Sequence, residues 1–305
     1  MGRRRRSTSD LEGVLIVDKP VGPTSHDVVQ RVRRATGQSR IGHTGTLDPA
    51  ATGVLVLCLG RTTKLVRFLQ AGTKTYAARM VLGVETDSQD ADGQVIATAD
   101  ASVIDERALC EALALQQGDI LQVPPMVSAV KVDGERLHEK ARRGEIVERE
   151  QRSVTVHDLV LDAFEPGERA EASFLVTCSA GTYVRTIAHD VGQQLGVGGS
   201  LVSLRRLANG PFTVEEAVDL EALEASNDPR ELVLRTEDTV ARALPSAQID
   251  DVEVARRLTQ GGRIAAQGFD GSYALTYGAQ LLGIYRDDGD QARSELVWTR
   301  PEELT

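Results

Sequence analysis

The sequence predicts an α+β protein with a mixed, mostly antiparallel sheet, flanking helices and a small β-rich C-terminal domain. Its 305 residues, 41% of them hydrophobic, are enough for a substantial core and for about two domains. Runs with strand character are interspersed with segments of helical spacing, without the regular alternation of a parallel βαβ fold. Short strand-like pieces separated by turns follow residues 260–262.

Helical spacing of apolar residues predicts the helices. In residues 24–35, Val28 and Val32 recur at that spacing, Thr24 stands at the start and Gly37 follows as a stop signal. Two later segments share this pattern, residues 105–117 and 182–195. Strands are predicted where apolar and β-branched runs are bounded by turn residues, at residues 54–59, 76–82, 153–161, 172–178 and 201–207.

The sequence also indicates where the domains divide. The polar stretch of residues 221–245 predicts a helical connection, and the strand-like pieces after it lie at residues 272–277, 280–285 and 294–299. We therefore expect a larger domain over residues 11–235 and a small β-rich domain over residues 246–305. Residues 1–10, which contain a run of arginines, are expected to be a disordered basic tail.

Charge is distributed unevenly along the chain. The net charge is −10, but residues 1–79 hold 14 Lys and Arg against 5 Asp and Glu, a balance of +9, so that the remainder carries −19. Because attraction to phosphates depends on the local field, a basic region on an acidic protein can bind nucleic acid. A solvated charge distribution without a partner is the alternative. The charged segment 132–152 is likewise either a projecting element or a solvated surface helix.

Cysteine usage and hydropathy favour a reducing compartment. Cys58, Cys110 and Cys178 are isolated, odd in number and in apolar surroundings, which predicts buried free thiols and no metal site. Asp18 and Lys19 interrupt the apolar run nearest the N-terminus, so no signal peptide is expected. No apolar run approaches the length of a membrane span. We expect a cytoplasmic protein.

The segment with the strongest functional character is residues 42–53, GHTGTLDPAATG, which runs directly into the predicted strand 54–59. Its glycines and proline indicate unusual backbone angles, and the apolar strand supplies a rigid base. Asp48 at its centre is the only acidic residue between Asp27 and Glu85. Taken alone, such an aspartate is either a turn-capping residue or a functional carboxylate.

The sequence lacks the common signals for bound cofactors. Residues 90–93 imitate part of a calcium loop, but Ser88 stands at the first ligand position and Ala99 at that of the closing glutamate. There is no GxxxxGK[ST] phosphate loop and no GxGxxG fingerprint. The sequence therefore implies neither calcium, ATP nor NAD.

Several segments, in order along the chain, resemble the bacterial tRNA pseudouridine-55 synthases of the TruB family. The Asp48 loop matches that family nearly residue for residue. The other matching segments are residues 13–25, 59–64, 74–76, 86–93, 124–131, 178–186 and 204–207. The resemblance implies a pseudouridine-synthase fold and a catalytic domain over residues 11–235. It also implies a thumb-like insertion at about residues 125–152 that grips RNA and a PUA-like RNA-binding domain at the C-terminal end.

The resemblance also assigns the chemistry. Asp48 is implied as the nucleophile that attacks either the sugar carbon or the pyrimidine ring of the uridine. Arg185 is implied as its partner, since a partly buried carboxylate needs a nearby cation to stay ionised, and Asp90 as the residue that holds the guanidinium. Tyr76 is implied as stacking platform and proton acceptor. Without the resemblance, Arg185 would be an ordinary surface residue and Tyr76 an ordinary core residue.

Further residues match family positions around the RNA. His43 is implied to stack into the gap left by the extruded base, although a loop histidine often forms only local hydrogen bonds. Tyr183 and Leu204 match positions that line the uracil pocket. Lys19, which precedes a proline, has a structural alternative. Basic positions around the cleft are matched by Lys19, Lys64 and Lys131.

The implied function is isomerisation of uridine 55 in the T loop of tRNA by base flipping, without a cofactor. The implied partner is the T stem-loop of tRNA, with no membrane partner and a monomeric protein. Two other functions stay open at this stage. A tRNA-folding chaperone would keep its activity without the Asp48 carboxylate, and a nucleosidase would release free uracil.

Overall fold

The computed structural model of the chain describes residues 10–126, 128, 131–132, 135–136, 143, 145 and 147–305. The expected disordered tail lies, apart from residue 10, outside this described part. The same is true of much of the expected thumb-like insertion.

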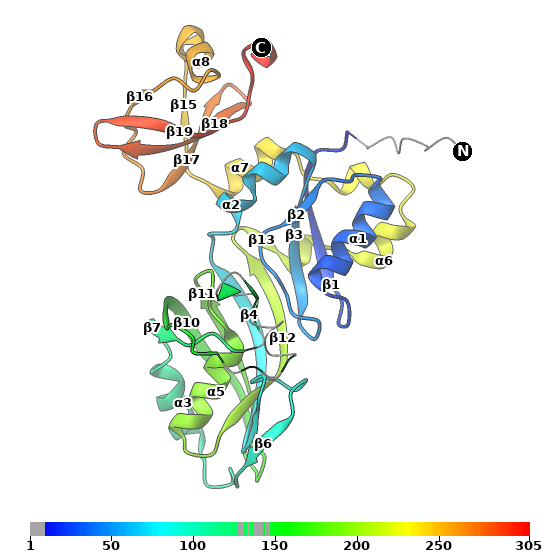
Figure 1. Cartoon of the computed structure of the whole chain (residues 1–305), viewed down its shortest axis with the longest axis vertical. Helices are drawn as coiled ribbons and strands as arrows, with labels where there is room; N and C mark the ends of the chain where they lie inside the picture. Colours follow the sequence, from blue (N-terminus) through cyan, green and yellow to red (C-terminus); the bar gives the residue numbers. More distant parts are fainter. Residues whose placement is uncertain are drawn as a thin grey trace.

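A ten-stranded sheet forms the larger part of the molecule (Figure 1). Its strands lie in the order β14 (Val218–Asp219), β1 (Gly13–Lys19), β3 (Thr52–Leu59), β12 (Gly199–Asn209), β4 (Lys74–Leu82), β11 (Glu171–Cys178), β10 (Arg152–Glu165) and β7 (Gly118–Gln122). In addition, β2 (Ile41–His43) pairs with β3, and β13 (Phe212–Thr213) pairs with β12. The pairs β1–β14 and β3–β12 are parallel and the other pairs of this sheet are antiparallel. The predicted mixed, mostly antiparallel sheet is therefore confirmed.

Three pairs of helices cover the sheet (Figure 1). α3 (Glu106–Ala114) and α5 (Val184–Gln194) pack on β4, β10 and β11, where Met80, Phe174 and Ile187 belong to one buried cluster. α1 (Ser25–Thr36) and α6 (Leu220–Ala225) cover one face of β1 and β3. Because side chains alternate along a strand, the opposite face of β1 and β3 forms a separate cluster with α2 (Val66–Leu69) and α7 (Thr236–Ala243).

The predicted first helix is confirmed together with its end signals. Thr24 caps α1, with reciprocal hydrogen bonds between Thr24 and Asp27, and Gly37 follows in the left-handed conformation at φ 69°. The helix predicted over residues 105–117 is shorter than expected, because α3 ends at Ala114.

The predicted β-rich C-terminal domain is a five-stranded sheet. Its strand order is β15 (Ser246–Gln248), β17 (Ser272–Tyr277), β18 (Gln280–Asp288), β19 (Gln291–Val297) and β16 (Ile264–Ala265), and α8 (Val252–Leu258) packs on it. This sheet also contributes Ile284 to the cluster that contains Val14 of the larger sheet, as does the nearby Trp298. The guanidinium of Arg61 lies 4.6 Å from the centre of a Trp298 ring. The two sheets therefore share part of one core.

Two short hairpins complete the fold. One joins β5 (Val84–Thr86) to β6 (Val95–Thr98), and its connecting loop carries Asp90. The other joins β8 (Lys131–Val132) to β9 (Glu135–Arg136) within the expected thumb-like insertion. No helix in the described part of the chain is long and apolar enough to cross a membrane.

One prediction about the cysteines is wrong. Cys58 and Cys178 are buried free thiols as expected, but Cys110 is exposed. Cys110 lies in α3 next to Leu109, which is fully buried, so it occupies the side of the helix that turns away from the sheet. Apolar neighbours in sequence do not place a helical residue in the core unless they share its face.

Candidate active site

Asp48 lies in the loop between β2 and β3, and buried polar side chains hold that loop in place. The Lys19 ammonium donates to the carbonyl oxygens of Pro20 (3.0 Å), Pro49 (3.1 Å) and Ala51 (2.6 Å). Lys19 is fully buried, and desolvation lowers its pKa to about 8. These contacts fit the alternative in which Lys19 has a structural role, because its ammonium binds backbone carbonyl oxygens of Pro20 and of the Asp48 loop.

A second anchor comes from the start of α1. The Ser25 hydroxyl donates to the Leu47 carbonyl at 3.0 Å and accepts from the Leu47 amide at 2.8 Å. The residue before Asp48 is thus fixed on both sides of its backbone. Because the loop is held by its backbone, the Asp48 carboxylate stays free to point outward, and its side chain is 47% exposed.

The Asp48 carboxylate meets a buried guanidinium from the other half of the sheet. Arg185 in the first turn of α5 places Nη2 3.1 Å from Asp48 Oδ2. Its Nη1 lies 2.9 Å from Asp90 Oδ2 and donates to the Ser88 carbonyl at 3.1 Å. The Arg185 side chain is only 6% exposed, so its charge acts in a poorly solvated position. One guanidinium therefore bridges the half-exposed Asp48 and the mostly buried Asp90.

The loop that carries Asp90 is itself closely fastened. The Ser88 hydroxyl donates to Asp90 Oδ1 at 2.5 Å, and the Thr86 hydroxyl donates to the Asp90 carbonyl at 2.7 Å. Gln89 adopts the left-handed backbone conformation at φ 66°, which is uncommon for a residue with a side chain. Its side-chain oxygen accepts from the Thr186 hydroxyl at 3.0 Å. The Asp90 loop is thus bound to α5 at two successive residues of the helix.

Tyr76 lies in β4, in the same buried cluster as Leu47. Its side chain is 8% exposed. Burial raises the pKa of its hydroxyl, and the neighbouring charge and hydrogen bond of Arg206 oppose that rise. Asp48 is close enough to disfavour the ionised tyrosine. Tyr76 therefore lies within the electrostatic influence of Asp48.

Comparison with known protein families shows to which family this chain belongs. Residues 33–184 match the model of the TruB family pseudouridylate synthase N-terminal domain, and residues 185–240 match that of the tRNA pseudouridylate synthase B C-terminal domain. The chain belongs to the TruB family. A tRNA pseudouridine synthase B of Thermobifida fusca is 45% identical over 269 residues, which cover 87% of this chain and 90% of that protein. One of Burkholderia mallei is 43% identical and covers 97% of both chains.

Solved structures agree with the fold of a TruB-family protein. A Cbf5–Nop10–Gar1 complex contains a chain that matches with a TM-score of 0.74 at 24% identity, covering 100% of this chain and 93% of that one. An H/ACA RNP bound to a substrate RNA containing 2′-deoxyuridine matches with a TM-score of 0.72 at 24% identity, covering 96% and 87%. The predicted family, fold and enzyme class, a pseudouridine synthase, are confirmed.

The remaining predicted site residues of this TruB-family chain lie on several different elements of the fold. Tyr183 immediately precedes α5, where its amide donates to Gln122 Oε1 at 2.9 Å and its carbonyl accepts from Gln122 Nε2 at 3.2 Å. Leu204 in β12 packs against the cluster that contains Tyr76. Tyr183 is thus fixed two residues before Arg185, and Leu204 lies on the same buried cluster as Tyr76.

His43 ends β2, five residues before Asp48. Burial lowers its pKa, with a smaller effect from Arg206, so its ring is neutral at neutral pH. Its Nδ1 is buried without a hydrogen-bond partner in the described part of the chain. Lys64 is exposed in the 3₁₀ turn η1 (Gly60–Leu65). The side chain of Lys131 lies outside the described residues.

The structure adds two buried cations that the sequence did not single out. Lys74 donates to the carbonyls of Gln70 (2.7 Å) and Gly72 (2.6 Å), and desolvation lowers its pKa to about 8. Arg206 in β12 is 1% exposed. For Arg206, the sequence signal was that Arg205 and Arg206 interrupt a predicted strand, residues 201–207, that is otherwise apolar on one face. Among the described residues, no cluster of three or more His, Cys, Asp or Glu could hold a metal ion.

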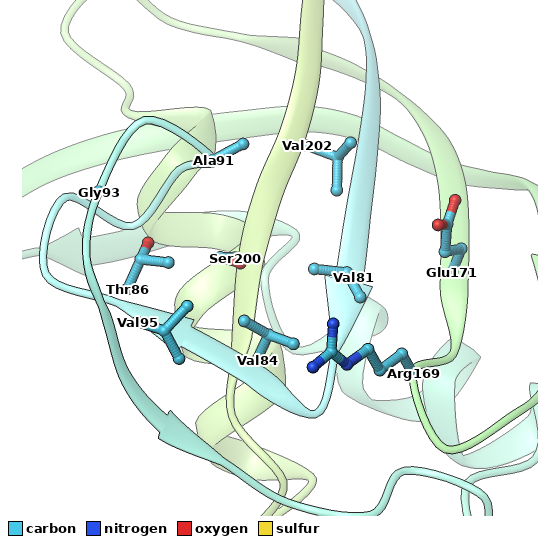
Figure 2. A pocket seen from close by; sticks show the side chains of 10 residues that line it. All are labelled: Val81, Val84, Thr86, Ala91, Gly93, Val95, Arg169, Glu171, Ser200 and Val202. Carbon is cyan, nitrogen blue, oxygen red and sulfur yellow. The ribbon is translucent and has the colours of Figure 1, made fainter.

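A pocket of about 260 Å³ lies on the face of the sheet opposite to the one that carries Tyr76 (Figure 2). It is bordered by Val81 of β4, Val202 of β12 and Val95 of the β5–β6 hairpin. Because side chains alternate along β4, Val81 points away from the face that carries Tyr76. None of the predicted site residues lines this pocket, so it is separate from the candidate active site.

Proposed function

We propose that this protein converts uridine 55 in the T loop of tRNA to pseudouridine, with Asp48 as the nucleophile. The single observation that carries the proposal is the Asp48–Arg185 pair, in which a half-exposed carboxylate is held 3.1 Å from a buried guanidinium. Such a carboxylate is paired with a cation, aimed and accessible, as a nucleophile requires. The tRNA substrate follows from the names of the TruB-family relatives, which are tRNA pseudouridine synthases.

The reaction is an isomerisation and needs no oxidant or reductant. The bond between N1 and the sugar carbon breaks, a bond from C5 to that carbon forms, C5 loses a proton and N1 gains one. Asp48 holds the reacting fragment covalently while the base turns over, through the sugar carbon or through the ring. The Arg185 charge stabilises the carboxylate before attack and when it leaves. No step calls for a cofactor.

The remaining side chains divide the work of binding and proton transfer. Tyr76 stacks on the target base and accepts the C5 proton. His43, neutral and partly buried beside the loop, fills the gap left by the extruded base, since stacking is worth about 1–3 kcal/mol per base. Tyr183 and Leu204 line the uracil pocket.

Binding of the RNA involves the whole chain. In our proposal Lys64 and Lys131 attract the backbone phosphates, and the thumb-like insertion at about residues 125–152 grips the T stem-loop. Residues 11–235 form the catalytic domain and residues 246–305 a PUA-like RNA-binding domain. The protein acts as a cytoplasmic monomer.

Incubation with an unmodified tRNA transcript and no added cofactor tests this function. Pseudouridine is mapped after the reaction and free uracil is assayed in parallel. We expect conversion at position 55 and no release of uracil, while a transcript with cytidine at position 55 stays unmodified. Conversion only at another uridine would refute the position, and released uracil without pseudouridine would indicate a nucleosidase.

A further inference from the structure

Arg206 is a fully buried arginine at the junction of the two halves of the larger sheet. Strand β12 is the only strand of that sheet's order that joins β3 to β4, and it meets β3 through two residue pairs, Arg205 with Thr52 and Arg206 with Gly53. The Asp48 loop enters the sheet through β3, and Tyr76 lies in β4. Arg206 therefore stands between the two groups on which the proposed chemistry depends.

The guanidinium of Arg206 holds both ends of the Asp48 loop. Its Nε donates to the Val54 carbonyl at 2.7 Å, after the loop, and its Nη2 donates to the Gly45 carbonyl at 3.1 Å, before it. Nη1 lies 3.5 Å from the Thr46 carbonyl oxygen. A planar, multiply donating group suits this arrangement better than an ammonium does. The loop and Arg206 also touch through the backbone, because a Cβ on Gly53 would lie 2.1 Å from the Arg206 carbonyl oxygen.

Arg206 is also the cross-strand neighbour of Tyr76. The two residues are directly paired in the antiparallel ladder of β12 and β4, where side chains on one face lie about 4.5–5.5 Å apart at Cβ. The charge of Arg206 lies close enough to the Tyr76 hydroxyl to favour its ionised form and so to oppose the rise of the Tyr76 pKa caused by burial. Among the described residues no carboxylate lies within ion-pair distance of Arg206, and its guanidinium donates to backbone carbonyl oxygens instead. Burying a charge without an acidic partner is costly, and the carbonyl oxygens of the Asp48 loop offset part of that cost.

We infer that Arg206 is a positioning residue for the isomerisation: it fixes the loop that aims Asp48 and supplies the cation that Tyr76 needs to accept a proton. This inference rests on the proposed function. In the step concerned, the C5–H bond breaks, its proton passes to the ionised Tyr76 oxygen, and the electron pair forms the C5–C6 double bond. N1 takes up a proton in exchange. A cation beside the phenolic oxygen stabilises the ionised form in surroundings that otherwise disfavour it.

Single-turnover rates and tRNA dissociation constants of four variants test the inference. Arg206→Met removes the charge, Arg206→Lys keeps it, Tyr76→Phe removes the hydroxyl, and the fourth combines Arg206→Met with Tyr76→Phe. Arg205→Met is the matched control, because Arg205 is the next residue of β12 and its guanidinium pairs with Asp18 at 2.6 Å on the other side of the strand.

We expect Arg206→Met to lower the single-turnover rate by about 100-fold while tRNA affinity changes by less than about threefold. Arg206→Lys should recover part of the lost rate, and Arg205→Met should stay within about threefold of the native rate. In the Tyr76→Phe background the further loss caused by Arg206→Met should be at least about tenfold smaller, because the two residues act together.

Two results would overturn the inference. One is an Arg206→Met protein whose rate stays within about threefold of native. The other is a double variant whose rate loss equals the product of the two single losses. Free-energy effects of independent residues add, so such a product would show that Arg206 and Tyr76 are not coupled. If Arg206→Met does not fold, the same cycle is made with Arg206→Gln, which also removes the charge but keeps a side chain that can donate to the loop carbonyls. Native protein that converts no uridine would refute the proposed function itself, which separates that failure from failure at Arg206 alone.

Discussion

The guanidinium of Arg185 lies 3.1 Å from the carboxylate of Asp48, although one residue belongs to the first turn of α5 and the other to the loop before β3. The same guanidinium lies 2.9 Å from Asp90. Asp48 is half exposed, whereas Arg185 and Asp90 are mostly buried. The buried Asp90 carboxylate therefore fixes the Arg185 guanidinium, whose other nitrogen faces the half-exposed Asp48 carboxylate.

The first prediction concerns that fixation. Asp90→Asn keeps the shape of the side chain but removes the charge that holds Arg185 Nη1, so Arg185 will orient Asp48 less well. We expect a 10- to 100-fold lower single-turnover rate, roughly the effect of losing a residue that orients a reacting group, with unchanged tRNA affinity. Asp92→Asn is the control, because the Asp92 side chain is exposed two residues away. Equal rates for the two variants would contradict the role of Asp90.

The second prediction concerns the close contact beneath the Asp48 loop. Gly53 has φ 98° and a Cβ there would lie 2.1 Å from the Arg206 carbonyl oxygen, whereas Gly210 has φ 58° with nothing within 4 Å. Both alanine variants strain the backbone by about 1–2 kcal/mol, but only Gly53→Ala also forces the strands apart. We expect Gly53→Ala to lower the free energy of unfolding by about 1–3 kcal/mol more than Gly210→Ala does. Urea denaturation measures the difference, which should be near zero if the contact is unimportant.

The third prediction concerns pH and Lys19. Burial lowers the Lys19 pKa from 10.5 to about 8, so between these pH values the unfolded chain binds the proton that the folded protein has released. The Lys19 contribution to the free energy of unfolding therefore rises with pH across this window. Other groups titrate there too, so the measured quantity is the difference between native protein and Lys19→Met in urea at pH 7 and pH 9.5. The free energy of unfolding of the native protein, relative to that of Lys19→Met, should be larger at pH 9.5 than at pH 7. A constant difference would contradict the lowered pKa.

The fourth prediction concerns the junction of the two sheets. Trp298 is 4% exposed, in one cluster with Val14 of the larger sheet and Phe68 of α2. Trp298→Ala leaves a large cavity, and we expect a loss of about 3–5 kcal/mol in the free energy of unfolding. The native protein should unfold in one transition, because the shared cluster couples both domains. Two separate transitions in calorimetry of the native protein would show that the domains are independent.

Periodic patterns in the sequence predict the parts of the fold whose side chains obey simple burial rules. α1 follows from valines at helical spacing and from its capping residues. β17 occupies the predicted residues 272–277, bounded by turn residues on either side. These elements are specified locally, so a single sequence is enough to locate them.

The parts that escape prediction depend on contacts between distant segments. Arg206 and Lys74 are charged, and nothing in a local pattern shows that carbonyl oxygens from other segments make their burial possible. Cys110 was misplaced because apolar neighbours do not determine which face of α3 a residue occupies. The pairing of Asp48 with Arg185 was expected from the family resemblance and not from spacing, because the two residues meet only when β12 joins the halves of the sheet.

Whether Asp48 performs the chemistry is decided by comparing the native protein with Asp48→Asn. The measurement is single-turnover formation of pseudouridine at position 55 of unmodified tRNA, with the tRNA dissociation constant determined for both proteins. We expect the rate of Asp48→Asn to be at least about 1,000-fold lower and its tRNA affinity to stay within about threefold of native. An Asp48→Asn protein that converts uridine 55 within about tenfold of the native rate would contradict the proposed role of Asp48.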